Sequence, residues 1–131
     1  MDRKQQAVEL HKNKFNCAQS LTCAFCNVMG ADPIQAFKQA EALGGGMGTL
    51  GTCGVLTGMA LVVGMKISDG NLDNPQTKKE CYRMMRILTE EFTAKFGSTI
   101  CAELKSGEKH VSCDDLIAYG AELLDHHLLG L

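Results

Sequence analysis

The sequence predicts an all-α protein: a single compact domain of five to seven helices arranged around a buried central helix. Apolar residues recur at steps of three and four along most of the 131 residues, which places them on one face of a helix. The period-two alternation that is typical of half-buried strands is missing. Residues 55–65 are almost wholly apolar and uncharged, as expected for a helix that others enclose. A chain of this length is expected to fold as one domain, residues 1–131.

The first three helices are predicted from capping residues and apolar spacing. The first covers about residues 2–12. Asn16 is expected to cap the second, and Gln19, three residues further on, completes a capping-box pattern. Asp32 is expected to cap the third helix, with Pro33 at its first position, where proline is favoured.

The central stretch combines a glycine-rich loop, residues 44–51, with the apolar helix that follows it. Glycines at this density indicate a sharp turn or a close approach of the backbone to another group. Thr52 is a good capping residue, so we expect Cys53 at the first position of the helix. The helix dipole and the free N–H groups at that position favour a thiolate, so we expect Cys53 to have a pKa below that of a free thiol.

A long amphipathic helix is predicted after an exposed loop at residues 68–74. Asn74 and Pro75 are expected to open this helix and Gly97 to stop it. Its apolar stripe advances in steps of three and four residues: Cys81, Met85, Leu88, Phe92 and Phe96.

The last part of the chain is expected to contain a short helical turn and a final helix. Ser98 or Thr99 would cap the turn, which carries Cys101. A loop is expected at residues 106–110, and Ser112 would cap the last helix.

Composition excludes several classes of function. The net charge is −2, and no cluster of lysines and arginines is longer than Lys78–Lys79, so we expect no nucleic-acid binding. The first ten residues contain no apolar core of signal-peptide length. The longest apolar run is about twelve residues, too short to span a bilayer. We therefore expect a cytoplasmic protein that makes no use of a membrane.

Seven cysteines are far more than a chain of this length usually carries, and the odd number argues against a disulfide framework. Four of them fall in a predicted first helical turn. We call these four the cysteine quartet: Cys17, Cys53, Cys101 and Cys113. If their helix ends converge, they form a pocket suited to several thiolates, a metal ion or an anionic cluster. The alternative is that each is a small buried apolar residue.

The other three cysteines have weaker signals. Cys23 and Cys26 form a C-x-x-C pair, but both lie within a predicted helix, whereas the first cysteine of a thioredoxin-like site opens one. A redox or metal role and a packing or interface role both remain open for this pair. Cys81 lies on an apolar stripe and is expected to be a core residue.

Two further patterns were considered as sites. Residues 46–51 read G-x-G-x-x-G, but they follow a predicted helix rather than a strand, so close backbone approach at Cys53 is favoured over nucleotide binding. His110 is close to Cys113 in sequence and is either a further ligand or a solvated loop residue.

Taken in order, several motifs resemble the C-GCAxxG-C-C family of redox-active proteins. They are N-C-A-Q at residues 16–19, G-G-G-M-G at 44–48, C-G-x-x-T-G at 53–58, F-G-S at 96–98, and the two late cysteines. The chain is also similar to the iron–sulfur portion of split-Soret cytochromes, although it has no C-x-x-C-H haem motif. The resemblance implies that the cysteine quartet forms a redox centre by binding an iron–sulfur cluster. Thr52 stands where the family motif has glycine.

Three functions remain open at this point. The first is electron transfer through an iron–sulfur cluster, most simply [2Fe–2S], held by the cysteine quartet and lost on handling in air. The second is metal-free thiol–disulfide exchange, in which Cys17 or Cys53 attacks and another member of the quartet resolves. The third is binding of Zn²⁺ or another soft ion. A redox role requires a partner protein, and the sequence leaves enzymatic turnover and a homo-oligomer open.

Overall fold

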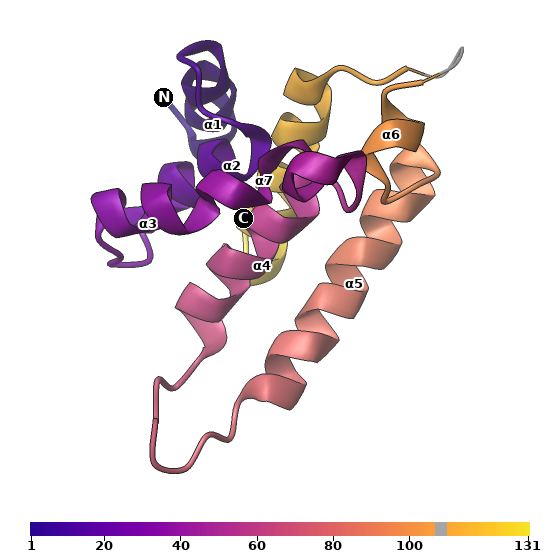
Figure 1. The fold of residues 1–131 in the computed structure, drawn as a ribbon. Coiled ribbons are helices and arrows are strands. Elements are labelled where there is room, and N and C mark those ends of the chain that lie inside the picture. The colour runs from indigo at the N-terminus through magenta and orange to yellow at the C-terminus, as the bar shows by residue number, and fades with distance from the viewer. Residues whose placement is uncertain (107–109) are drawn as a thin grey trace.

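The computed structural model describes residues 1–106 and 110–131 of the chain. Within these ranges the fold is all-α, as predicted, with one isolated β-bridge and no strand. The described residues form seven α-helices (Figure 1): α1 (Arg3–Lys12), α2 (Cys17–Cys26), α3 (Pro33–Ala40), α4 (Gly54–Ile67), α5 (Lys78–Phe96), α6 (Cys101–Leu104) and α7 (Cys113–Leu129). Two short turns, η1 (Glu41–Leu43) and η2 (Gly46–Leu50), connect α3 to α4.

Side-chain caps set the start of four helices, and three of these caps are predicted from the sequence. Asp2 and Asn16 begin α1 and α2, and each forms a complete capping box with the residue three positions later. Asp32 caps α3, and Ser112 caps α7 by accepting a hydrogen bond from the Asp115 N–H group. These caps fix the first residues of α2 and α7, both of which are cysteines.

Helix α2 lies at the centre of the packing, in contact with α1, α3, α4 and α7. Glycines allow α2 and α4 to approach closely. A Cβ atom added at Gly58 would lie 3.0 Å from the Cα atom of Ala18, and one added at Gly54 would lie 3.1 Å from the Cβ atom of Cys17. The N-terminal ends of α2 and α4 are therefore held against each other.

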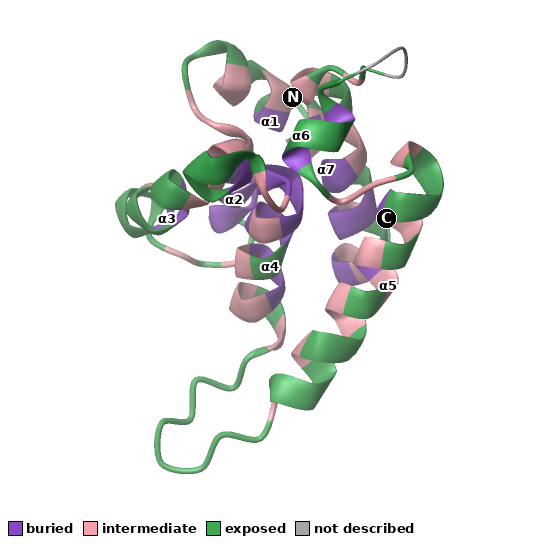
Figure 2. Cartoon of the chain, turned by 45° about the vertical axis from the view of Figure 1, so that its right-hand side comes forward, coloured by how far each residue is buried: buried purple, intermediate pink, exposed green. Residues whose placement is uncertain are grey.

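The expectation that α4 is enclosed on all sides is wrong. Val55, Met59 and Val62 are fully buried, but Ala60 is exposed on the opposite face of the helix. Figure 2 shows buried, intermediate and exposed stretches along α4. A Cβ atom at Gly64 would also meet nothing within 4 Å. That face carries small residues and borders a cavity of about 230 Å³, which Met85 and Thr89 of α5 also line.

Helix α5 begins at Lys78, three residues later than the Asn74-Pro75 signal predicts. In the loop before α5, side chains accept hydrogen bonds from backbone N–H groups of the same loop. Asp69 accepts from the Asn71 N–H group at 3.1 Å, and Thr77 accepts from the Asp69 N–H group at 3.3 Å. Such local bonds compete with helix formation and keep the loop in its own conformation.

Two further expectations concern the connections. Gly97 ends α5 in the left-handed conformation, with φ of 84°, as predicted. The loop expected at residues 106–110 includes residues 107–109, which lie outside the described residues. No helix in the described ranges is long and apolar enough to cross a membrane.

Candidate metal and redox site

The structure brings the cysteine quartet together from four separate segments. Cys17 and Cys113 are the first residues of α2 and α7, Cys101 is the first residue of α6, and Cys53 immediately precedes α4. Cys53 and Cys101 are only 3% and 4% exposed, whereas Cys17 and Cys113 are partly buried. All four are free thiols.

A short backbone strap places Cys53 beside Cys101. The Cys53 N–H group donates to the Thr99 carbonyl at 2.8 Å, and the Cys101 N–H group donates to the Gly51 carbonyl at 2.6 Å. Between these two bonds, Thr52 and Ile100 form the antiparallel bridge. The strap therefore ties the segment before α4 to the segment before α6.

This strap also corrects two capping predictions. Thr52 lies in the bridge and makes no cap, and Cys53 itself occupies the capping position, so that Gly54 is the first residue of α4. Ile100 occupies the capping position of α6, in place of Ser98 or Thr99, and makes no side-chain cap bond. Because α6 is only four residues long, its dipole contributes little to Cys101.

The glycine-rich turn at Gly46–Leu50 packs against the same strap. Gly46 has φ of 64°, and its carbonyl accepts hydrogen bonds from the Gly51 N–H group at 3.1 Å and from the Thr49 hydroxyl at 2.9 Å. A Cβ atom added at Gly46 would lie 2.3 Å from the Gly51 nitrogen and 3.0 Å from the Cβ atom of Cys101. The sequence predicts close backbone approach at Cys53; at Gly46 the approach is instead to Gly51 and Cys101.

Cys17 and Cys113 form a hydrogen-bonded pair of thiols. The Cys17 thiol donates to the Cys113 sulfur, which lowers the pKa of Cys113 to about 6 and raises the pKa of Cys17. The Lys105 ammonium and the His11 ring act in the same direction on Cys113. The pair therefore holds one proton near neutral pH, with the negative charge on Cys113.

Lys105 supplies the positive charge at this site. The Cys113 thiolate is the main cause that raises the pKa of Lys105, and Cys101 and Cys17 raise it further. Burial opposes this effect without overcoming it. One lysine thus interacts electrostatically with three of the four cysteines. The sequence analysis did not select it, because nothing in its sequence context marks it as different from other surface lysines.

The prediction of a low pKa for Cys53 is wrong in direction. Burial raises the pKa of Cys53, and the nearby N–H groups of Val55 and Leu56 oppose this effect without overcoming it. The neighbouring Cys101 and Cys113 sulfurs raise it further. Burial of the thiolate costs more solvation free energy than its hydrogen bonds to the two N–H groups contribute.

His11 is a second site residue, after Lys105, that the sequence does not single out. One of its ring nitrogens, the Cys17 sulfur and the Cys113 sulfur all lie within 4.8 Å of one another. Its Nδ1 atom is hydrogen-bonded to the Asp114 carboxylate at 2.8 Å. The only sequence signal is its position in the last turn of α1, six residues before Cys17, which by itself identifies no ligand.

The remaining candidates lie away from this group. Burial raises the pKa of Cys23 to about 11, and the Cys26 thiol donates to the Cys23 carbonyl at 3.1 Å. Cys81 packs against the hydrophobic core, as expected. His110 is exposed and donates through Nδ1 to the Lys105 carbonyl at 2.7 Å, which occupies that nitrogen.

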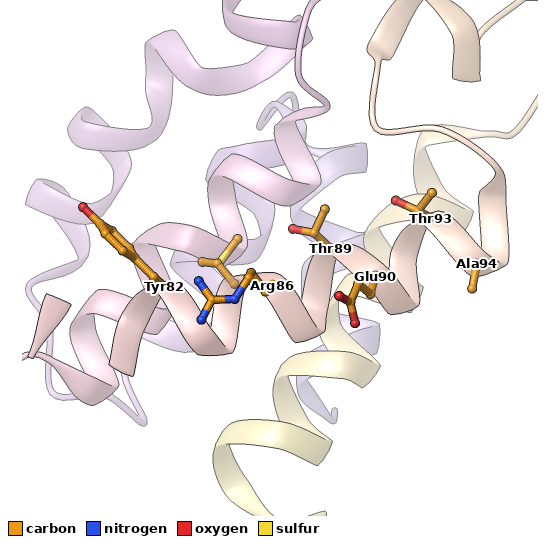
Figure 3. A pocket seen from close by; sticks show the side chains of 7 residues that line it. Tyr82, Arg86, Thr89, Glu90, Thr93 and Ala94 are labelled. Atoms are coloured by element: carbon orange, nitrogen blue, oxygen red, sulfur yellow. The ribbon is translucent and has the colours of Figure 1, made fainter. Parts of the chain in front are cut away.

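A hollow of about 750 Å³ lies along α5 (Figure 3). No cysteine and no histidine lines it. The lining residues belong to a single helix: Tyr82, Met85, Arg86, Thr89, Glu90, Thr93 and Ala94. The hollow therefore contains none of the candidate site residues, and the cysteine quartet remains the candidate site.

The lowered pKa of Cys113 predicts a selectively reactive thiol. Since the thiolate is the nucleophile, alkylation of Cys113 by iodoacetamide should rise as the pH passes through about 6 and level off above about 7. Cys23, with a pKa of about 11, should react far more slowly at pH 7 although it is also only partly buried. Peptide mass spectrometry after a short pulse of reagent in the metal-free, reduced protein measures both sites.

Lys105→Met provides the matched variant for this experiment. Loss of the ammonium should shift the Cys113 alkylation profile to higher pH, because a neighbouring positive charge favours the thiolate. Lys95→Met removes a lysine that instead lies over the Tyr119 ring, 5.3 Å from its centroid, and should leave the profile unchanged. Equal profiles for Cys113 and Cys23 would contradict the assignment.

The fold and the site define an all-helical, cysteine-rich protein with a cluster of thiols at converging chain segments. A family model described as "Putative redox-active protein (C_GCAxxG_C_C)" matches residues 15–127, and the chain belongs to this family. Searches of curated proteins and of solved structures return no match. The resemblance that the sequence motifs indicate is thereby confirmed at the level of the family.

Proposed function

We propose that this protein is an electron-transfer protein that binds an iron–sulfur cluster through the cysteine quartet. The observation that carries the proposal is that four free thiols from four different segments interact electrostatically: Lys105 acts with Cys17, Cys101 and Cys113, and Cys53 acts with Cys101 and Cys113. Cysteine thiolates are the usual ligands of such clusters, and a [2Fe–2S] cluster takes four of them. Membership of a redox-active family supports the same assignment.

The donor set fits this cofactor chemically. Cys53 and Cys101 lie in the protein interior, where they shield a bound group from water, whereas Cys17 and Cys113 are partly exposed. Lys105 balances part of the negative charge that four thiolates bring together. When bound, the cluster supplies one-electron redox chemistry. The protein's own contribution is to hold the thiols, limit solvent access and offset their charge.

The absorption spectrum of protein purified without oxygen tests this proposal. We expect visible sulfur-to-iron charge-transfer bands that bleach on addition of dithionite, because the cluster accepts an electron. A colourless protein after anaerobic purification and reconstitution, with all four thiols reduced, would contradict it. The redox partner would be a second protein, which supplies or takes up the electron.

Thiol–disulfide exchange is the second candidate, and the hydrogen-bonded Cys17–Cys113 pair favours it. The Cys113 thiolate would attack a partner disulfide, forming a mixed disulfide and releasing one partner thiolate. Cys17, losing its proton, would then attack the Cys113 sulfur and release the second partner thiolate. The pair gives up two electrons and forms a disulfide, while the partner disulfide gains these two electrons and takes up the Cys17 proton and one proton from the solvent.

This second function predicts a result that the cluster does not require. In a variant that carries Cys53→Ser and Cys101→Ser, oxidation by a small disulfide should still lower the protein mass by two hydrogens and join Cys17 to Cys113. Stable retention of both thiols under these conditions would exclude the exchange mechanism.

A further inference from the structure

The donor group formed by His11, Cys17 and Cys113 has a composition that the four-cysteine cluster does not use. We propose that the apo protein binds one divalent metal ion of the Zn²⁺ type through these three residues. Their donor atoms all lie within 4.8 Å of one another, and Cys53 and Cys101 are not part of that group. Imidazole nitrogen and thiolate sulfur are the donors that Zn²⁺ prefers in proteins.

The geometry needs only small side-chain movements to close around an ion. Zinc–sulfur bonds are about 2.3 Å and zinc–nitrogen bonds about 2.0–2.1 Å, so donors in a tetrahedral site lie roughly 3.3–3.8 Å apart. The three donors come from α1, α2 and α7, and these helices pack against one another in every pairing. Ligands on mutually packed helices are held more firmly than ligands on loops.

Asp114 orients the imidazole for this role. An ionised carboxylate can only accept, so the 2.8 Å bond between its Oδ1 atom and the His11 Nδ1 atom places the ring proton on Nδ1. In the form that binds a metal ion, the ring then presents the lone pair of Nε2. A carboxylate that fixes the tautomer and direction of a metal-binding histidine is a recurrent second contact in metal sites.

Exposure indicates an ion that can enter and leave. The side chains of His11 and Asp114 are 29% and 43% exposed, and Cys113 is also partly exposed. Three protein ligands leave the fourth position of a tetrahedral ion for water or another small ligand. This arrangement is typical of an open site and differs from a closed structural zinc site with four protein ligands.

The inference goes beyond the proposed cluster and does not depend on it. The ion and the cluster would share Cys17 and Cys113, so they are alternative occupants of one region. Cys53 and Cys101 distinguish them, because only the cluster requires those two thiols. His11 also distinguishes them, because only the divalent ion requires its imidazole.

Titration of the reduced apo protein with Co²⁺, without oxygen and with a non-thiol reductant, tests the site. We expect one Co²⁺ per chain, with a sulfur-to-cobalt charge-transfer band and the intense visible bands of tetrahedral coordination. Asp114→Asn should weaken binding by about 10–100-fold, as is typical for a residue that orients a ligand. His11→Ala should weaken it by more than that, since a ligand itself is lost.

Two sets of controls accompany the titration. Cys53→Ser and Cys101→Ser should retain Co²⁺ affinity within about threefold, although they lose the ability to load an iron–sulfur cluster. His127→Ala is the matched control for His11, because His127 also pairs with a carboxylate, that of Glu91, but lies in the last turn of α7. It should bind Co²⁺ as the wild type does.

The outcomes separate the two sites. Absence of Co²⁺ binding by the wild type, or unchanged binding by His11→Ala, would overturn the inference. So would an equal loss in Cys53→Ser and in His11→Ala, since the ion would then use the quartet. If His11→Ala fails to fold, ¹⁵N NMR of the wild-type histidine rings decides: on addition of Zn²⁺ the His11 resonances should shift and those of His127 should not. Iron and sulfide content, measured separately, reports on the cluster alone.

Discussion

Cys53→Ser is expected to reduce iron–sulfur loading to background. Cys53 is 3% exposed, and the strap from Gly51 to Cys101 holds it beside another member of the quartet. Serine preserves the size of the side chain but replaces the soft thiolate ligand with a hydroxyl, a poor ligand for iron in such clusters. The measurement is the iron and acid-labile sulfide content after anaerobic reconstitution.

Cys81→Ser is the matched control for this variant. Cys81 is also a free cysteine, but it packs against the core from α5 and belongs to a different part of the molecule. We expect this variant to load a cluster as the wild type does, with some loss of stability. Equal loading of Cys53→Ser and the wild type would show that Cys53 is not a ligand.

Gly46→Ala is expected to have the largest effect on folding and on the geometry of the site. Its φ of 64° costs an alanine about 1–2 kcal/mol. The new Cβ atom would in addition lie 2.3 Å from the Gly51 nitrogen, so the turn must move, which typically costs about 1–3 kcal/mol more. Gly51 accepts the hydrogen bond from Cys101, so the displacement should also disturb the quartet.

Gly48→Ala separates the two contributions. Gly48 lies in the same turn with φ of 72°, but a Cβ atom there would meet nothing within 4 Å. It should therefore show only the backbone cost of about 1–2 kcal/mol. Thermal or urea unfolding of the reduced apo proteins gives the free energy of unfolding for both variants. Equal destabilisation of the two would contradict the close approach at Gly46.

Features that depend on local sequence could be predicted in advance. The caps at Asn16 and Ser112 follow from side chains that bind N–H groups three residues away, so they are visible in a short window. They also placed Cys17 and Cys113 correctly at helix starts. The family motifs indicate all four members of the quartet, and two of them, Cys17 and Cys113, lie with His11 in a group whose donor atoms are within 4.8 Å of one another.

Features that depend on contacts between distant segments could not be predicted. Thr52 looks like a cap, but its bridge to Ile100 takes it out of that role. The sign of the pKa shift of Cys53 depends on burial, which outweighs the helix start that the sequence suggests. His11 reaches the site only because α1 packs against both α2 and α7.

The iron and acid-labile sulfide content of the wild-type protein, reconstituted without oxygen, tests the central proposal most directly. The account predicts about two iron atoms and two sulfides per chain, as a [2Fe–2S] cluster on four cysteines requires. Iron and sulfide at background, in a protein whose four quartet thiols are shown to be reduced and whose helical fold is intact, would contradict it.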